Sequence, residues 1–194
     1  LIAWQNSESE KHEESLARLK ARVALSKASD RQEDYDAAVQ SLRKGQTAAF
    51  AEGARIAHGV ALAKVPYVVQ HITDTLEEVG KVVVFAHHLD VIEQFQSAFP
   101  GSVKVTGEVS YEDRQSAVDR FQKDETCRVF IGGIHAAGVG LTLTASSHVI
   151  FAELDWVPGN MSQAEDRCHR IGQAESVLVQ HLVLEGSLDA RKAR

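Results

Sequence analysis

The sequence predicts an α/β fold in which a parallel sheet is flanked by helices and preceded by a helical segment. The first third of the chain has no run of β-branched residues, whereas short apolar runs recur from Lys81 onward. The stretches between these runs have the periodicity of amphipathic helices. Strands that alternate with helices are joined by right-handed crossovers, and this arrangement produces a parallel sheet.

Individual elements follow from local patterns. Continuous apolar runs indicate strands that are covered on both faces; we expect them at residues 81–86, 102–106, 127–131, 148–152 and 177–183. Helices between them are expected at residues 90–99, 111–123 and about 160–170. Ser110, followed by Asp113 three residues later, is a typical cap for the second of these. In the first third, residues 13–23 have a weakly amphipathic helical pattern. We also expect a helix over about 32–42 that Gly45 ends, a helix over 47–63 and, after Pro66, a helix over 67–79.

Composition and charge exclude several classes of protein. Acidic residues number 27 and basic residues 21, which gives a net charge of −6, and the whole deficit lies in residues 63–194. A basic nucleic-acid arm and a polybasic membrane patch are therefore excluded. Two cysteines, with neither a secretory pattern nor an apolar run of about 18 residues, indicate an intracellular protein of the bacterial cytoplasm, the nucleoid or the nucleus. The single methionine is Met161, so we expect the chain to be a fragment.

A glycine-rich loop follows the third expected strand. Four glycines between residues 132 and 140 let backbone N–H groups approach an anion, and Thr142 and Thr144 add hydroxyl donors. The alternative interpretation is a purely structural turn. The loop is not a Walker A motif, because Gly-Lys-Ser/Thr does not occur in the chain, and no acidic pair follows a strand to hold Mg²⁺. We therefore do not expect this chain to hydrolyse nucleotide by itself.

The segment from residue 163 to residue 173 suggests a phosphate ligand. If residues 160–171 are helical, Arg167 and Arg170 project from one face and Gln163 lies on nearly the same face. Two guanidinium groups and an amide suit a multiply charged oxygen ligand such as a triphosphate. The alternative is a solvated helix in which neighbouring carboxylates pair with the arginines.

Two further features have competing interpretations. The histidines and cysteines lack the spacing of a zinc motif, so we expect no metal site. Trp156 lies in a Pro-Gly loop after a strand, where it is either a buried anchor or an exposed ring that meets a base or sugar.

These segments resemble the C-terminal RecA-like helicase lobe of Swi/Snf-type DNA-dependent ATPases of superfamily 2. Residues 163–173, Gln-Ala-Glu-Asp-Arg-Cys-His-Arg-Ile-Gly-Gln, are similar to helicase motif VI, and residues 137–145 are similar to motif V. Residues 83–88 resemble motif IV, residues 107–114 the small motif after it, and residues 155–159 the Trp-Asn-Pro segment that precedes motif VI. The Ala-His-His ending of motif IV and the Gln-Ala-Glu-Asp-Arg run are most similar to the annealing-helicase branch.

The resemblance implies an ATP-driven translocase on double-stranded or branched DNA that is built from two lobes. Residues 60–194 would be the second lobe, and residues 1–59 would be a helical segment that joins or decorates the lobes. The first lobe, elsewhere in the same polypeptide, would make most of the contacts to ATP and Mg²⁺. This chain alone would hold neither. By itself this chain is expected to be inactive, whereas the whole polypeptide would be an ATP hydrolase that couples hydrolysis to DNA translocation.

The resemblance also implies roles for individual residues. The catalytic residues would be Arg170, as the arginine finger, and Arg167. The nucleotide would be contacted by Gln163, Gly138 and Gly140. DNA would be contacted by Thr142, His87, Arg114 and Trp156.

The chain departs from the family pattern at a few positions, and other functions stay open. His135 stands where relatives often carry lysine or arginine, Val157 replaces an asparagine, and Gly132-Gly133 replaces a Ser/Thr-containing turn. One alternative function is a non-catalytic module that binds DNA or protein. Another is a doubly wound transferase that binds a sugar nucleotide in the glycine loop, but this leaves the Arg-x-x-Arg-Ile-Gly-Gln run unexplained.

Overall fold

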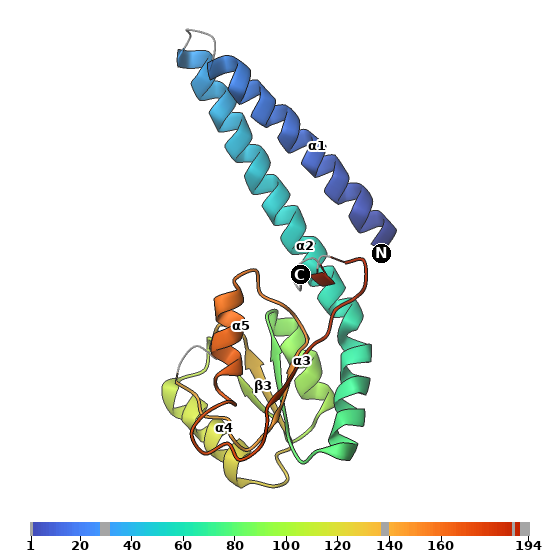
Figure 1. Ribbon diagram of the computed structural model, residues 1–194, viewed down its shortest axis with the longest axis vertical. Coiled ribbons are helices and arrows are strands. Elements are labelled where there is room, and N and C mark those ends of the chain that lie inside the picture. Colours follow the sequence, from blue (N-terminus) through green and yellow to red (C-terminus); the bar gives the residue numbers. More distant parts are fainter. Residues whose placement is uncertain (1, 28–31, 137–139, 188, 191–194) are drawn as a thin grey trace. The chain divides into compact units, whose positions relative to one another are not determined.

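The computed structural model describes residues 2–27, 32–136, 140–187 and 189–190 (Figure 1). Contacts divide the chain into two units, Leu1–Gly59 and Val60–Arg194. Among the residues described, no helix combines the length and the apolar character that crossing a bilayer requires.

The first unit contains α1 (Ile2–Lys27) and the beginning of α2 (Gln32–Glu78), which lie side by side (Figure 1). The expected helix end at Gly45 is wrong, because α2 continues through it. A Cβ atom at Gly45 would lie 2.6 Å from Cδ1 of Leu19 on α1. The glycine therefore permits a close approach of the two helices rather than ending one of them.

The expected break at Pro66 is also wrong, because Pro66 lies inside α2. Val65 and Val68 on either side of it are buried in the second unit. A proline inside a helix removes one backbone hydrogen bond, and burial of the neighbouring apolar side chains offsets that loss here. Tertiary packing thus overrides local helix propensity.

The second unit contains a five-stranded parallel sheet of order β2-β3-β1-β4-β5. Its strands are β1 (Val82–Ala86), β2 (Val103–Val105), β3 (Val129–Gly133), β4 (His148–Phe151) and β5 (Leu178–His181). Its shorter helices are α3 (Leu89–Ala98), α4 (Tyr111–Lys123) and α5 (Pro158–Glu165). This arrangement confirms the expected fold class, a parallel sheet flanked by helices with a helical N-terminal segment.

Both faces of strand β1 are buried, as its run Val-Val-Val-Phe-Ala predicts. Val82, Val84 and Ala86 point into a core shared with α3 and the last part of α2. Val83 and Phe85 point into the opposite core, which contains residues of α4 and α5. The expected cap of α4 is confirmed, since Ser110 Oγ accepts a hydrogen bond from the backbone N–H of Asp113 at 3.1 Å.

Strand β3 begins and ends two residues later than expected, so Gly132 and Gly133 belong to the strand and not to the loop after it. A Cβ atom at Gly132 would lie 2.7 Å from Cε1 of Phe85 on the neighbouring strand. Phe85 is completely buried and its ring packs at 5.3 Å from that of Phe151. Gly132 therefore makes room for a large aromatic side chain in the core.

The carboxyl ends of β3, β1 and β4 meet at one edge of the sheet. The connection after β1 leads to β2, at one end of the sheet. The connections after β3 and β4 lead to β4 and β5, in the opposite direction along the sheet. Loops that diverge in this way create a crevice at the carboxyl edge, which is the usual ligand position in open α/β sheets.

Candidate functional site

Hydrogen bonds tie the motif V segment (residues 137–145) to the motif VI segment (residues 163–173). The backbone N–H of Leu143 donates to the carbonyl of Arg167 at 2.9 Å. Nη1 of Arg170 donates to the carbonyl of Leu141 at 3.3 Å and lies 3.1 Å from Oγ1 of Thr142, which is 28 positions away in sequence. Arg170, Arg167 and Thr142, each selected from the sequence, are thus brought together.

The helix that precedes these arginines is shorter than expected. Helix α5 ends at Glu165, and turns follow in which Arg167 N–H donates to Ala164 and Cys168 N–H donates to Glu165. Beyond this end, the carbonyl of Arg167 accepts from Leu143 and the side chain of Cys168 is buried in the core, so contacts outside the helix hold these residues. The expectation that both arginines project from one helical face is therefore wrong, although Arg170 still reaches the motif V segment.

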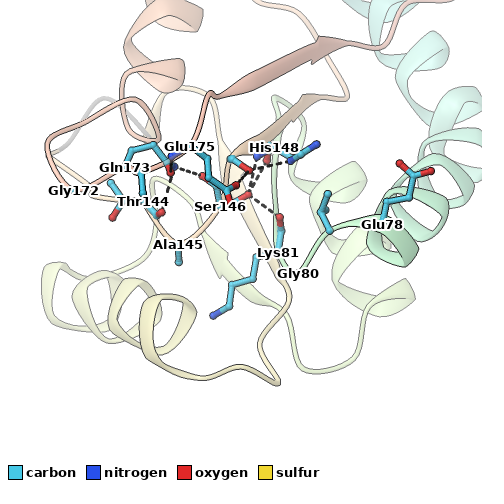
Figure 2. Close-up of a pocket in the computed structure, with 13 residues that line it drawn as sticks. Glu78, Gly80, Lys81, Thr144, Ala145, Ser146, His148, Gly172, Gln173 and Glu175 are labelled. Atoms are coloured by element: carbon cyan, nitrogen blue, oxygen red, sulfur yellow. Dashed lines mark hydrogen bonds between the residues drawn. The ribbon is translucent and has the colours of Figure 1, made fainter.

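Two glutamines stabilise the motif V segment and the loop after it through hydrogen bonds. Nε2 of Gln173 donates to the carbonyls of Thr144 at 3.3 Å and Ser146 at 2.8 Å, as Figure 2 shows. Nε2 of Gln122, on α4, donates to the carbonyl of Thr142 at 2.7 Å and to Oγ1 of Thr144 at 3.3 Å. Sequence reasoning missed Gln122, because a glutamine within a surface helix carries no signal of a bond to a distant loop.

Gln173 also lines a cavity of about 570 Å³ beside the amino ends of β1, β4 and β5 (Figure 2). Ser146 Oγ donates to the carbonyl of Lys81 at 2.8 Å, and Ser147 Oγ donates to Glu175 at 2.8 Å. The ammonium group of Lys81 donates to the backbone carbonyls of Phe121 and Asp124. These bonds join the starts of three strands, so the polar groups around the cavity have a structural role.

The residues expected to contact nucleotide lie in different surroundings. Gly140 is exposed and has a φ of 54°, which favours glycine. Gly138 lies outside the described residues. Gln163 is exposed on α5, within the motif VI segment.

A second group of side chains gathers at the carboxyl edge of the sheet. His87 follows β1 and His135 follows β3, and their ring centroids are 5.2 Å apart. Nε2 of His135 lies 3.3 Å from Oδ2 of Asp155, which follows β4. One ligating atom from each of these three residues can be chosen so that all lie within 4.8 Å of one another. Spacing in the sequence did not reveal this cluster, because its members are 20 and 48 positions apart.

Glu153 holds the loop after β1. Its Oε2 accepts hydrogen bonds from the backbone N–H groups of His87 at 2.9 Å and His88 at 3.0 Å, and its Oε1 lies 2.5 Å from Nδ1 of His88. Burial favours the neutral acid, but these hydrogen bonds outweigh it, and the pKa of Glu153 lies below its ordinary value. The buried carboxylate is thus charged and fixes the backbone at the histidines.

The electrostatics of the cluster favour a neutral His87 and an ionised Asp155. Burial lowers the pKa of His87, and the neighbouring His88 and His135 lower it further. For Asp155, burial opposes ionisation, but hydrogen bonds from Val157 N–H and Asn160 outweigh it, so the pKa lies below its ordinary value. At neutral pH, therefore, His87 presents a neutral imidazole rather than a cation.

His87 and Arg114, both expected to contact DNA, line one cavity of about 420 Å³. Arg114 donates to the carbonyl of Val109 at 3.1 Å and so holds the loop after β2. Trp156 is 59% exposed, which excludes the interpretation as a buried anchor. The structure thus brings His87 and Arg114 together, whereas Thr142 lies with Arg170 at the other group.

The comparisons with known proteins agree with this architecture. Residues 63–172 match the helicase conserved C-terminal domain family. The chain is 25% identical to a solved structure described as the C-terminal part of the Fun30 ATPase domain, with a TM-score of 0.58 over 61% of this chain and 39% of that one.

Curated relatives point to one branch of that family. Over 134 residues the chain is 46% identical to human "DNA annealing helicase and endonuclease ZRANB3", covering 66% of this chain and 12% of the relative. Over 113 residues it is 44% identical to a Caenorhabditis elegans homolog of "SWI/SNF-related matrix-associated actin-dependent regulator of chromatin subfamily A-like protein 1", covering 56% of this chain and 16% of the relative. The chain thus spans less than a fifth of the length of these relatives. It belongs to the helicase conserved C-terminal domain family and is a C-terminal helicase lobe of the Swi/Snf type.

Proposed function

We propose that this chain is the second motor lobe of an ATP-dependent translocase on double-stranded DNA and that Arg170 is its arginine finger. The observation that carries the proposal is the position of the Arg170 guanidinium, 3.1 Å from Oγ1 of Thr142 and 3.3 Å from the carbonyl of Leu141. Both partners are neutral oxygen acceptors, and Arg170 itself is an exposed residue. A phosphate oxygen binds a guanidinium more strongly than they do, because the hydrogen bond is then charge-assisted.

In this proposal the nucleotide is bound chiefly by another lobe, because the chain has neither a Walker A motif nor an acidic pair for Mg²⁺. This chain adds positive charge at the γ-phosphate through Arg170, with Arg167 beside it. Gln163, Gly138 and Gly140 complete the surface that faces the nucleotide. Gln173 and Gln122 support that surface, since each donates to carbonyls of the motif V segment or the loop after it.

DNA is proposed to lie against the carboxyl edge and the motif V segment, where His87, Arg114, Thr142 and Trp156 would contact it. Relatives whose name describes a DNA annealing helicase support this choice of partner. Contacts to sugar and phosphate carry no base information, so binding should be nearly independent of sequence. With a net charge of −6, the chain relies on local donors rather than on a general positive field.

The test is DNA-stimulated ATP hydrolysis by a polypeptide that contains this lobe together with a phosphate-loop lobe. Arg170→Ala should lower kcat by on the order of 10³-fold or more while nucleotide binding is retained, as expected for an arginine finger. Arg120→Ala is the matched control, because the Arg120 guanidinium also donates to a backbone carbonyl, that of Gly101, but lies outside the motif V and motif VI segments. Unchanged turnover in Arg170→Ala would refute the assignment and favour a non-catalytic binding module.

The same assay on residues 1–194 alone tests whether this chain contains a complete nucleotide site. We expect no significant ATPase activity from this chain, with or without DNA, because half of the nucleotide site is supplied elsewhere. Robust DNA-stimulated turnover by the chain alone would show that it contains a complete site.

A further inference from the structure

We propose that His87, His135 and Asp155 form a binding site for a divalent transition-metal ion, with Zn²⁺ as the fitting ion. The three residues follow β1, β3 and β4, which are neighbours in the sheet, so their side chains converge at its carboxyl edge. This edge is the usual ligand position of an open α/β sheet. The spacing of these residues in the sequence matches no zinc motif, so no metal site was expected here.

The separation of the ligand atoms fits a metal ion. Two ligands bound at about 2.0–2.1 Å to one tetrahedral Zn²⁺ lie about 3.4 Å apart. Nε2 of His135 and Oδ2 of Asp155 are already 3.3 Å apart. The ligating atom of His87 lies within 4.8 Å of both, so it must close by at most about 1.4 Å. Its side chain is exposed, and a rotation of the ring supplies that movement.

Groups around the cluster hold the ligands in place. Oδ1 of Asp155 accepts from the backbone N–H of Val157 at 2.7 Å, and Oδ2 accepts from Nδ2 of Asn160 at 3.1 Å. The amide of Asn160 is also 3.5 Å from Nδ1 of His135, the ring nitrogen that would not bind the metal. Partners of this kind orient metal ligands and fix histidine tautomers. At His87 the backbone is fixed by its bond to Glu153.

The chemistry of the donors selects the class of ion. Two imidazole nitrogens and one carboxylate oxygen suit Zn²⁺ and similar transition metals, whereas Mg²⁺ and Ca²⁺ prefer oxygen ligands. Three protein ligands leave a coordination position open, which water or another oxygen donor can occupy.

The alternative is a cluster that binds no metal, in which His135 pairs with Asp155 and the ring of His87 packs edge to face against that of His135. Titration calorimetry distinguishes the two, with metal-free residues 1–194 as the protein and Zn²⁺ alone as the probe. The proposal predicts one ion per chain with a micromolar or lower Kd and a higher Tm in the presence of Zn²⁺. Co²⁺ should produce the visible absorption bands of a coordinated ion.

Variants assign the binding to these residues. His87→Ala and His135→Ala should each weaken binding of Zn²⁺ by at least 10-fold, and they should leave the fold intact because both side chains are exposed, that of His135 to 61%. His169→Ala removes an exposed histidine outside the cluster and should bind Zn²⁺ like the unaltered chain. Absence of binding, or equal affinity in the His87, His135 and His169 variants, would overturn the proposal.

Discussion

Replacement of Gly132 by alanine tests why the chain has two consecutive glycines at the end of β3. The added Cβ atom would lie 2.7 Å from Cε1 and 2.9 Å from Cδ1 of Phe85. Carbon atoms in contact are normally about 3.5–4.0 Å apart, so the overlap is about 0.8 Å. The ring cannot easily move away, because Phe85 is completely buried against Phe151.

The size of the effect follows from two opposing contributions. Overpacking of a core by one methyl group costs about 1–3 kcal/mol, whereas replacing glycine restricts the unfolded chain and contributes about 0.4–1 kcal/mol to stability. We expect Gly132→Ala to lower the free energy of unfolding by about 1–2 kcal/mol. Gly133→Ala is the matched control, since its Cβ would have neighbours at 3.7–3.9 Å, which is ordinary contact. It should be neutral or slightly stabilising.

The assay is urea unfolding followed by pulse labelling of Cys127 and Cys168, which are both buried in the second unit, so the labelling reports on that unit alone. With a slope of about 2 kcal/mol per molar urea, the two alanine variants should differ in midpoint by about 1 M. Equal midpoints, or a higher midpoint for Gly132→Ala, would show that the Phe85 ring relaxes and that close packing is not the reason for this glycine.

Two further predictions concern groups buried in the second unit. The Lys64–Asp189 ion pair has side chains only 7% and 6% exposed, so Lys64→Met should cost about 3–5 kcal/mol in urea unfolding by leaving a buried carboxylate unpaired. The double variant Lys64→Met/Asp189→Leu should recover most of this, and a cost below about 1 kcal/mol for the single variant would contradict the reasoning. Burial raises the pKa of the Cys168 thiol to about 12. Above about pH 9 the thiol therefore loses its proton in the unfolded chain but keeps it in the folded chain. The free energy of unfolding should then fall with pH more steeply than in Cys168→Ala, by about 1.4 kcal/mol per pH unit. Equal slopes of the free energy of unfolding against pH in the two proteins would contradict this. Burial raises the pKa of Cys127 as well, so rapid alkylation of either thiol in the folded chain at pH 8 would also contradict it.

Those parts of the fold that depend on local chemistry could be predicted from the sequence. The run of β1 is apolar at every position because both faces of the strand are covered, and the cap of α4 involves residues three positions apart. Gly45 and Pro66 misled the prediction because each is a helix breaker only where nothing else stabilises the helix. At Gly45 the close approach of Leu19, and around Pro66 the burial of the valines, decide the outcome.

The candidate site could be predicted in part, for a related reason. Motif spacing identified Arg167, Arg170 and Thr142, and the structure places them in one group. Motif spacing did not predict that α5 ends at Glu165, because the residues after this end are held by distant contacts, such as the bond to Arg167 from Leu143, 24 positions before it. The cluster of His87, His135 and Asp155 was also missed, because it depends on the strand order β3-β1-β4, which the order of strands in the sequence does not reveal.

The topology also explains why one loop serves both groups. Strands β3 and β4 are parallel and lie on either side of β1, so the chain between them must return from the carboxyl edge of the sheet to its amino edge. His135 lies at the start of that connection, within the edge cluster, and Thr142 lies near its end, beside Arg170. The edge cluster and the contact between Thr142 and Arg170 are therefore joined by one covalent connection. Any parallel sheet with this strand order imposes the same return, so the link between the two groups is a consequence of topology and not of the loop's own sequence.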